Sequence, residues 1–384
     1  MEAVILCGGL GTRLRGVVDD LPKTLAPVSG KPFLEYLLEE LARSGFTRIV
    51  LSVGYLREQI FRFMESRSWP FAVDYAVEET PLGTGGGIRL ALSRCREDRV
   101  FVLNGDTFFH VDYASMPWDA PVTLALKPMR RFDRYGAVVV EGDCVTAFQE
   151  KAPCEEGLIS GGVYAIVRSR LDLSGCGDKF SFEKDVLEPF SARGLVAASV
   201  QDGYFIDIGI PDDFALAQQE LPELQTVLSA SEKVMAAPEA DFLFLDRDGV
   251  INRLLRGDYV KTWEEFCFLP GVLEEMRRWA GRYRRILLVT NQRGVGRGVM
   301  TREALEDIHE KMLAEIRRHG GRIDRIYVCT AVSDDDPRRK PHPGLFQEAC
   351  ADFPDIVPGR SLMLGDAPSD KAFALACGMR FIQF

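Results

Sequence analysis

The chain has 384 residues, 46% of them hydrophobic and 27% charged, and its net charge is −10. This length favours two domains over one, and the negative charge argues against a nucleic-acid-binding surface. No apolar run approaches the roughly 18 residues of a membrane span, and no charged leader precedes an apolar segment at the start. Nine scattered cysteines without a Cys-x-x-Cys pair are typical of reduced thiols. We therefore expect a cytoplasmic enzyme or binding protein, without a nucleic-acid or membrane partner.

The first half of the chain alternates strand-like and helical patterns. Short apolar runs occupy residues 3–6, 48–53, 73–76, 100–103, 122–126, 137–140 and 163–167. Helical patterns, such as residues 33–44, lie between the early runs. This alternation predicts an α/β domain with a doubly wound, mostly parallel sheet. Because ligands bind such sheets beyond the carboxyl ends of the strands, the residues that follow each run are candidate site residues.

The first apolar run ends in a glycine-rich loop, and residues 6–14 read LCGGLGTRL. Gly8, Gly9 and Gly11 let the backbone approach a ligand closely and expose N–H groups toward an anion. Arg13 and the positive end of a helix expected just after the loop would both favour a negative charge. The loop therefore predicts a phosphate site.

Spacing excludes two common phosphate motifs. A dinucleotide fingerprint fails because its third glycine would fall at Leu14. A P-loop fails because Pro32 follows Gly30 and Lys31, where serine or threonine is required. What remains is the glycine loop followed by Lys23. A lone lysine is more often a solvated surface residue, but its place after this loop favours a phosphate ligand.

Two further apolar runs of the first half end in aspartate, at Asp106 and at Asp207. Two separated carboxylates together with substrate phosphates are a usual way to hold Mg²⁺, although an aspartate after a glycine more often caps a turn. Residues 82–87 form a second glycine-rich stretch. We expect it to be a loop before a helix at residues 88–93, open enough for a base or sugar to lie against its backbone.

Several segments of the first 220 residues together resemble the sugar-1-phosphate nucleotidyltransferases, and most closely the D-glycero-α-D-manno-heptose 1-phosphate guanylyltransferases. The matching segments are residues 6–14, 21–23, 30–36, 81–86, 104–109, 132–136, 150–151 and 204–209. They keep the order of the family over about one domain's length. In this family, a sugar-1-phosphate oxygen attacks the α-phosphorus of the nucleotide and pyrophosphate leaves, so positioning and charge neutralisation replace a protein nucleophile.

The resemblance implies a role for individual residues. It places Arg13 and Lys23 on the triphosphate, as catalytic cations, and Asp106 and Asp207 on Mg²⁺. It implies nucleotide or sugar-phosphate contacts for Leu6, Gly8, Gly9, Gly11, Thr12, Gly83, Thr84, Gly85, Asn104, Gly105, Gly136, Glu150 and Lys151.

The pattern changes after residue 220. Residues 221–240 are rich in Ala, Glu and Leu rather than in Gly and Ser. This composition predicts a semi-rigid linker, helical between Pro222 and Pro238. We therefore expect domains at residues 1–220 and 241–384.

The second half repeats the arrangement of polar groups at strand ends. Residues 242–245 form an apolar run that ends in Asp246 and Asp248, a spacing that lets one carboxylate attack phosphorus while the other handles a proton. Later runs end in Thr290 and in Asp366, and Lys340 supplies a cation. A generic acidic turn is the simpler interpretation of the first motif alone. The further strand ends favour a phosphatase site with Mg²⁺.

Residues 246–252, 290–298 and 339–344 resemble the haloacid-dehalogenase-type phosphatases, and within them the D-glycero-D-manno-heptose 1,7-bisphosphate 7-phosphatases. The resemblance covers the chain from about residue 241 and implies a second Rossmann-like sheet without a large cap. It implies that Asp246 is the nucleophile and Asp248 the acid/base, with Thr290 and Lys340 on the phosphate. The implied Mg²⁺ ligands are Asp246, Asp366 and the Asp248 carbonyl, and the further substrate contacts are Asn291, Arg297 and Arg339. A histidinol-phosphate phosphatase remains an alternative for this half.

One segment departs from many relatives, which carry a Cys/His zinc loop before the Arg-Lys-Pro motif. Residues 329–338 contain one cysteine and no histidine. Four zinc ligands cannot be assembled from them, so the sequence predicts no structural zinc.

Together the two halves predict a bifunctional enzyme of nucleotide-activated heptose biosynthesis. The second half would remove the 7-phosphate of heptose 1,7-bisphosphate, and the first half would join the 1-phosphate to a nucleotide, with GMP from GTP preferred. The expected partners are these small molecules alone. Alternatives are that one half is a binding or regulatory module, or that the product is an ADP-heptose or GDP-mannose type of sugar nucleotide. The glycine loops do not distinguish guanine from adenine, and the oligomeric state stays open.

Overall fold

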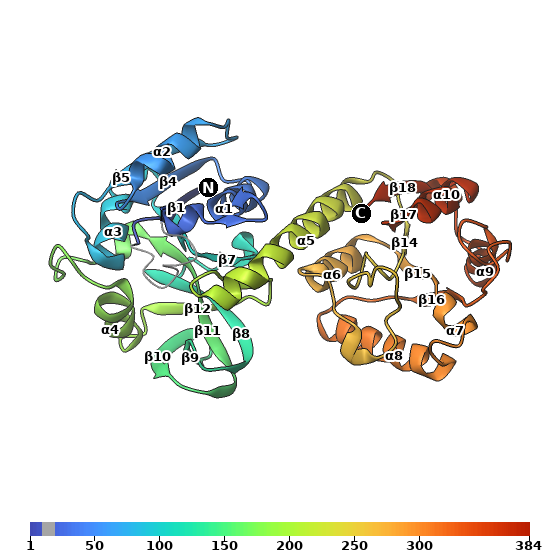
Figure 1. The fold of residues 1–384 in the computed structure, drawn as a ribbon. Helices are drawn as coiled ribbons and strands as arrows, with labels where there is room; N and C mark the ends of the chain where they lie inside the picture. The colour runs from blue at the N-terminus through green and yellow to red at the C-terminus, as the bar shows by residue number, and fades with distance from the viewer. Residues whose placement is uncertain (10–19) are drawn as a thin grey trace. The chain divides into compact units, whose positions relative to one another are not determined.

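The computed structural model describes residues 1–9 and 20–384 (Figure 1). The chain divides into two compact units, Met1–Gln219 and Glu220–Phe384. Each unit combines a central sheet with helices, which confirms the α/β class expected from the alternating pattern. Within the described ranges, every helix is too short or too polar to cross a membrane.

The first unit contains most of the strands of the chain. Its strands are β1 (Glu2–Leu6), β2 (Pro27–Val28), β3 (Lys31–Pro32), β4 (Arg48–Val53), β5 (Ala72–Val77), β6 (Arg99–Asn104), β7 (Thr107–Phe109), β8 (Val122–Phe132), β9 (Gly136–Glu141), β10 (Cys144–Lys151), β11 (Cys154–Val167), β12 (Val196–Val200) and β13 (Phe205–Asp207). Its α-helices are α1 (Phe33–Arg43), α2 (Arg57–Glu65), α3 (Gly83–Leu92), α4 (Glu188–Ser191) and the start of α5 (Pro211–Ala236).

The main sheet of this unit has the order β5-β4-β1-β6-β11-β8-β12-β10-β9. Strands β5, β4, β1 and β6 are parallel, as the sequence predicts. From β11 onward the sheet is mixed, because β11 runs antiparallel to both β6 and β8. Strands β9 and β10 are joined by a short turn and pair antiparallel, as such a connection requires. The carboxyl ends of β1 and β6 lie side by side, with Leu6 opposite Asn104.

The second unit has a five-stranded parallel sheet of order β16-β15-β14-β17-β18. Its elements are β14 (Phe242–Leu245), α6 (Val272–Arg282), β15 (Arg285–Asn291), α7 (Arg293–Gly296), α8 (Arg302–Arg318), β16 (Arg325–Cys329), α9 (Gly344–Asp352), β17 (Ser361–Gly365), α10 (Pro368–Ala376) and β18 (Arg380–Gln383).

Alternating residues of β14 divide the second core into two layers, because successive side chains of a strand point to opposite faces. Leu243 and Leu245 pack with residues of α5, α6 and α8. Phe242 and Phe244 pack with residues of α9 and α10 on the other face. Helices therefore cover both faces, as in the doubly wound arrangement that we expected (Figure 1). This burial fixes β14 at the centre of the sheet, with Asp246 just beyond its carboxyl end.

The segment expected to be a linker, residues 221–240, is helical as far as Ala236. Helix α5 continues through Pro222, and its buried residues Val227, Ala230 and Val234 belong to the core of the second unit. Ser231 accepts a hydrogen bond from Trp279 Nε1 at 2.9 Å. The segment is thus an integral part of the second unit, because its apolar face is needed to complete that core.

Candidate active sites

The first candidate site is a cluster of one lysine and two aspartates in the first unit. Lys23 Nζ lies 2.5 Å from Asp106 Oδ2 and 3.9 Å from Asp207 Oδ1. The lysine side chain is largely buried, whereas both carboxylates are partly exposed. The structure therefore brings together three predicted residues that are far apart in the sequence, and it leaves oxygen ligands open to solvent.

Three backbone features hold this cluster in place. Asp106 lies in the turn between β6 and β7, and Asp207 ends β13 opposite Thr107 of β7. The Gly209 N–H donates to Asp207 Oδ1 at 2.7 Å. A Cβ at Gly105 would lie 2.4 Å from the Leu6 carbonyl oxygen, so glycine is required for β6 to turn this close to β1.

Only part of the predicted glycine loop lies in the described ranges. Gly8 and Gly9 follow β1 after Cys7, and Gly9 has open space where a Cβ would stand. Gly11, Thr12 and Arg13 lie outside the described residues. Their expected contacts with the triphosphate therefore remain predictions.

Glu78, which the sequence analysis did not identify, lies next to the start of this loop. A Cβ on Gly8 would lie 2.7 Å from Glu78 Oε1, and a Cβ on Gly87 would lie 2.9 Å from the same atom. Oε1 also accepts the Ser52 hydroxyl at 2.9 Å, and Oε2 accepts the Leu82 N–H at 3.2 Å. Glycines from separate segments thus make room for one half-buried carboxylate beside the end of β1.

The second glycine-rich stretch differs from our expectation. Helix α3 begins at Gly83, so residues 83–87 are helical rather than a loop before the helix. The Gly85 N–H donates to the Phe180 carbonyl oxygen at 3.0 Å, and a Cβ on Gly85 would overlap the Phe180 ring. The Thr84 hydroxyl donates to Glu183 and accepts the Phe182 N–H. Packing against residues 180–183 therefore overrides the low helix propensity of glycine.

The remaining predicted residues of this unit lie at the edge of the cluster or outside it. Asn104 ends β6, and its side chain lies close to the backbone of Gly162. Gly162 has a positive φ of 70°, and a Cβ there would lie 2.7 Å from Asn104 Nδ2. Gly136 pairs with Lys151 across β9 and β10, and the Glu150 and Lys151 side chains are exposed. Tyr135, next to Gly136, has a raised pKa because of burial and of the nearby Asp207.

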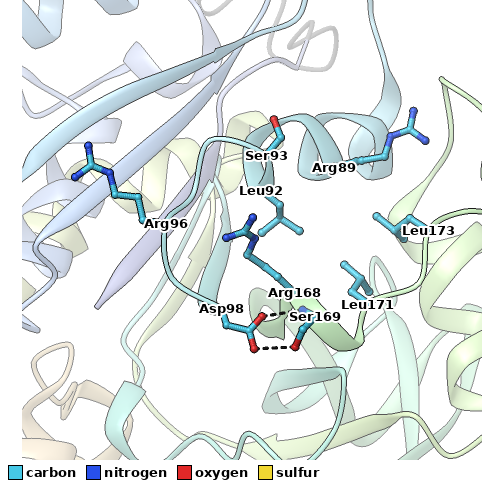
Figure 2. Close-up of a pocket in the computed structure, with 9 residues that line it drawn as sticks. All are labelled: Arg89, Leu92, Ser93, Arg96, Asp98, Arg168, Ser169, Leu171 and Leu173. Carbon is cyan, nitrogen blue, oxygen red and sulfur yellow. Dashed lines mark hydrogen bonds between the residues drawn. The ribbon is translucent and has the colours of Figure 1, made fainter.

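A separate open hollow of about 520 Å³ lies in the first unit, at the amino end of β6 (Figure 2). Two of its charged side chains, Asp98 and Arg168, are engaged with the protein itself. Asp98 accepts the N–H and hydroxyl of Ser169, each at 2.8 Å, and Arg168 donates to the carbonyl oxygens of Cys95 and Glu97. Because Asp106 follows the carboxyl end of the same strand, the hollow is distinct from the Lys23 cluster.

The second candidate site is an acidic cluster around Lys340 in the second unit. Lys340 Nζ lies 2.9 Å from Asp246 Oδ1 and 2.6 Å from Asp370 Oδ1, and all three side chains are largely or fully buried. Asp246, Asp366 and Asp370 each offer a carboxylate oxygen, and these atoms lie within 4.8 Å of one another. A Cβ on Gly249 would lie 2.3 Å from Asp366 Oδ2, so the chain needs glycine beside this carboxylate.

Negative charge is crowded in this cluster, and the pKa values of its groups are shifted. Burial raises the pKa of Asp246 to about 7, with Lys340 opposing the shift and Asp370 adding to it. Burial and Asp370 likewise raise the pKa of Asp366 to about 6. Burial alone would lower the pKa of Lys340, but Asp246 and Asp370 hold it above its ordinary value. When all three carboxyl groups are ionised, they exceed the one ammonium by two negative charges, which is the charge that Mg²⁺ would neutralise.

The carboxylate of Asp248 lies in a network of N–H donors. It accepts bonds from Arg247 Nε and NH2, from Asn252 Nδ2 and from Gln292 Nε2. Burial alone would raise the pKa of Asp248, but Arg247, Asn252 and Gln292 outweigh it and lower the pKa. Burial and Arg247 lower the pKa of His309 to about 3, so this histidine is neutral beside Arg247.

Further predicted residues surround Lys340. Thr290 is buried in β15, and its Oγ1 accepts the Gln292 amide at 2.9 Å. Asn291 exchanges two hydrogen bonds with the backbone of Lys340, each at 3.1 Å. Arg339 Nε donates to Asp334, which also pairs with Arg293. Arg297 is exposed, and its guanidinium donates to the Tyr259 hydroxyl at 3.3 Å.

Sequence reasoning missed Glu78 and the joint role of Arg247, Gln292 and His309. A position directly after a strand was the available signal for Glu78, because it occupies the same kind of strand end as Asp106. The burial of Arg247 carries no local signal, since it depends on Gln292, which follows β15, and on His309 of α8.

Comparison with known proteins agrees with this geometry. Residues 2–223 match the nucleotidyl transferase family model, and residues 337–383 match the HAD-hydrolase-like model. The chain is 45% identical to D-glycero-alpha-D-manno-heptose 1-phosphate guanylyltransferase of Aneurinibacillus thermoaerophilus, over 58% of this chain and 98% of the relative. It is 42% identical to D-glycero-alpha-D-manno-heptose-1,7-bisphosphate 7-phosphatase of Mycobacterium tuberculosis, over 34% of this chain and 70% of the relative.

Among solved structures, HddC from Yersinia pseudotuberculosis complexed with GMP-PN matches with a TM-score of 0.52 and 37% identity. The match covers 57% of this chain and 98% of HddC. The resemblances inferred from the sequence are therefore confirmed for both halves. The chain belongs to the nucleotidyl transferase family through its first unit, and it joins to this unit a second, HAD-like domain related to sugar-bisphosphate phosphatases.

Proposed function

We propose that the chain performs two consecutive steps in the synthesis of a nucleotide-activated heptose. The Glu220–Phe384 unit would hydrolyse the 7-phosphate of D-glycero-D-manno-heptose 1,7-bisphosphate. The Met1–Gln219 unit would then transfer GMP from GTP to the resulting heptose 1-phosphate. One observation carries the proposal: each unit holds its own lysine-and-carboxylate cluster, with an aspartate just beyond the carboxyl end of a parallel strand, and each has a relative that is named for a heptose phosphate.

In the first unit, transfer would depend on positioning and charge. An oxygen of the sugar 1-phosphate attacks the α-phosphorus of the nucleotide, the bond to the bridging oxygen breaks, and pyrophosphate leaves. Lys23, which now pairs with Asp106, would hold phosphate oxygens together with Arg13. Such charge stabilisation without a covalent intermediate is typical of phosphoryl and nucleotidyl transfer.

Glu78 supports guanine as the base. An ionised carboxylate only accepts hydrogen bonds. Guanine presents two adjacent donors, N1–H and the N2 amino group, whereas adenine presents an acceptor beside its amino group. The half-buried Glu78 lies beside Gly8 at the end of β1, close to where a triphosphate on the glycine loop would begin. The residue therefore offers a means of selecting GTP over ATP.

In the second unit, Asp246 would act as the nucleophile. A carboxylate oxygen of Asp246 attacks the 7-phosphorus, and the bond to the sugar oxygen breaks. Asp248, which must first take up a proton and release one of its N–H partners, gives that proton to the sugar oxygen. Water then attacks the phosphorus of the aspartyl phosphate, and Asp248 takes the proton as phosphate leaves. Lys340 and Thr290 would hold the phosphate oxygens, and Arg339, with Asn291 and Arg297, would contact the rest of the substrate.

The donor sets of both units fit Mg²⁺, which prefers carboxylate oxygen and retains several waters. Asp106 and Asp207 would hold it in the first unit, and Asp246, Asp366 and the Asp248 carbonyl in the second. Mg²⁺ would neutralise charge on the transferring phosphorus group. All nine cysteines are free thiols, which supports the cytoplasm as the site of both reactions.

Separate substitutions test the proposal. Asp106→Asn should remove pyrophosphate release from GTP and heptose 1-phosphate, and Asp246→Asn should remove phosphate release from the bisphosphate. Each loss should be at least about 100-fold, since single groups that stabilise developing charge contribute at least that much. Asp178→Asn, at a fully exposed aspartate in the first unit, is the matched control.

The two activities should fail independently. Each variant should retain the reaction of the other unit. The proposal is wrong if either variant keeps its own activity, or if the wild-type protein consumes no bisphosphate with Mg²⁺ and any nucleoside triphosphate.

A further inference from the structure

Arg247, between the two aspartates of the phosphatase motif, is among the largest fully buried side chains in the described parts of the chain. Burial of a guanidinium is costly unless each of its N–H groups finds a partner. Here Nε donates to Asp248 Oδ2 at 3.2 Å, and NH2 donates to Asp248 Oδ1 at 3.0 Å. NH2 also donates to Gln292 Oε1 at 3.1 Å, and NH1 lies 3.2 Å from His309 Nε2. Arg247 thus directs two N–H groups of its planar guanidinium at the two oxygens of Asp248.

The second fixed partner of Asp248 is Gln292. Its amide Nε2 donates to Asp248 Oδ2 at 2.7 Å and lies 2.9 Å from Thr290 Oγ1. The amide cannot be flipped without loss, because its Oε1 already accepts an N–H from Arg247. Since Thr290 accepts this bond, its own hydroxyl proton is left for an acceptor such as a phosphate oxygen.

These contacts restrict the Asp248 carboxylate completely. With the bond from Asn252 at 2.9 Å, four N–H groups reach its two oxygens, about as many as an ionised carboxylate can accept, so Asp248 must release one of these bonds when it carries a proton. Arg247 accounts for two of the four, in the planar geometry that a guanidinium matches best. Rotation of the carboxylate would break several of these bonds at once, so its direction is set by its partners.

We propose that Arg247 and Gln292 are positioning residues for Asp248. They set the direction from which Asp248 delivers a proton to the leaving sugar oxygen. Gln292 also links the Asp248 carboxylate to the phosphate-binding Thr290. The inference rests on the proposed phosphatase function of the second unit. Neither residue would touch the substrate. Their effect would pass entirely through Asp248 and Thr290.

The experiment measures phosphate release by Arg247→Lys and Gln292→Met in the full chain. Arg247→Lys keeps the positive charge but loses the paired N–H donors of the guanidinium. Gln292→Met keeps the side-chain volume but loses the amide group. Both should lower kcat with heptose 1,7-bisphosphate by about 100-fold, the cost of a small misplacement of a catalytic group. KM should change little, because the phosphate ligands remain.

Two readouts separate positioning from general damage. In an Asp248→Asn background, neither substitution should lower kcat further, since their route of action is already lost. With p-nitrophenyl phosphate, whose leaving group departs without a proton, both variants should lose much less activity than with the sugar bisphosphate. Glu275→Gln is the control, because Glu275 is also fully buried in this unit and bonds to Ser231 and Arg278.

The inference would be overturned if both substitutions lowered activity equally on the two substrates, or equally with and without the Asp248 carboxylate. Gln292→Met decides the matter if Arg247→Lys does not fold, as judged by circular dichroism. A wild-type protein that hydrolyses neither substrate with Mg²⁺ would instead refute the phosphatase assignment, and the inference with it.

Discussion

The ammonium of Lys340 lies 2.9 Å from Oδ1 of Asp246, and this ion pair opposes the effect of burial on the carboxylate. Burial still raises the pKa of Asp246 to about 7. The nucleophile must be ionised to attack, so phosphate release should rise with pH on the acid side of its profile.

Lys340→Met should move that acid limb to higher pH. Loss of a positive charge at this distance raises the pKa of a carboxyl group by about 1–3 units, so Asp246 would stay protonated further up the pH scale. The variant should also have a lower kcat, because a phosphate ligand is lost. The measurement is kcat/KM for phosphate release against pH at fixed Mg²⁺, and an unmoved acid limb would contradict the assignment.

Glu78→Gln should weaken selection of GTP. Replacing one acceptor oxygen with a donor removes one of the two hydrogen bonds to guanine, and a bidentate contact to a base is worth about 1–3 kcal/mol. We expect kcat/KM with GTP to fall by roughly 10- to 100-fold relative to ATP. Glu79→Gln is the control, because Glu79 is exposed and pairs with Arg57. An unchanged GTP-to-ATP ratio would exclude Glu78 from base recognition.

Gly249→Ala should damage the phosphatase site through Asp366. Gly249 has a φ of 83°, and a Cβ there would lie 2.3 Å from Asp366 Oδ2. Gly257 has a similar φ of 79° but open space around its missing Cβ. Both alanine variants should therefore cost about 1–2 kcal/mol in backbone strain.

Only Gly249→Ala should raise the Mg²⁺ concentration needed for half-maximal phosphate release, since only that methyl group displaces a metal ligand. The pair is measured by thermal unfolding and by Mg²⁺ titration of activity. Equal Mg²⁺ requirements in the two variants would argue against Asp366 as a ligand.

Glu40→Gln should remove part of the acid sensitivity of the first unit. Burial alone would raise the pKa of Glu40, but His110 and then Arg43 outweigh it and lower the pKa below 4.5. A carboxyl group with a lowered pKa stabilises the fold above its unfolded pKa, and that contribution is lost as the pH falls toward the folded value.

The variant should be less stable at neutral pH, by about 1–3 kcal/mol for a buried charged hydrogen bond. Its stability should also fall less steeply between neutral and acid pH than that of the wild type. Thermal unfolding across this range tests the prediction, with Glu39→Gln on the same helix as control, because Glu39 is partly exposed and pairs with Lys31. Parallel pH profiles for Glu40→Gln and the wild type would refute it.

The residues that the sequence predicts best follow strands directly. Asp106 and Asp246 follow apolar runs that form strands, and parallel strands bring such ends together by geometry. Lys23 instead begins a short 3-10 helix after Pro22, and the glycine loop before it was the signal. The start of α3 at Gly83 could not be predicted, because local propensity disfavours a helix of glycines and only contact with Phe180 reverses the preference. Glu78 and Arg247 were missed because their partners come from distant segments that meet only in the folded chain.

Helix α5 also determines how the chain could be divided for separate expression. A fragment beginning at residue 241 would lack Val227, Ala230 and Val234, which are fully or almost fully buried in the second core. Loss of each valine removes about 1.5–3 kcal/mol of burial, and it uncovers Trp279, Met276 and other apolar side chains. Such a fragment should aggregate, whereas one that begins at Glu220 retains the helix and with it the sealed core. To express the two activities separately, the chain should therefore be divided just before Glu220, which lies within the continuous helix α5.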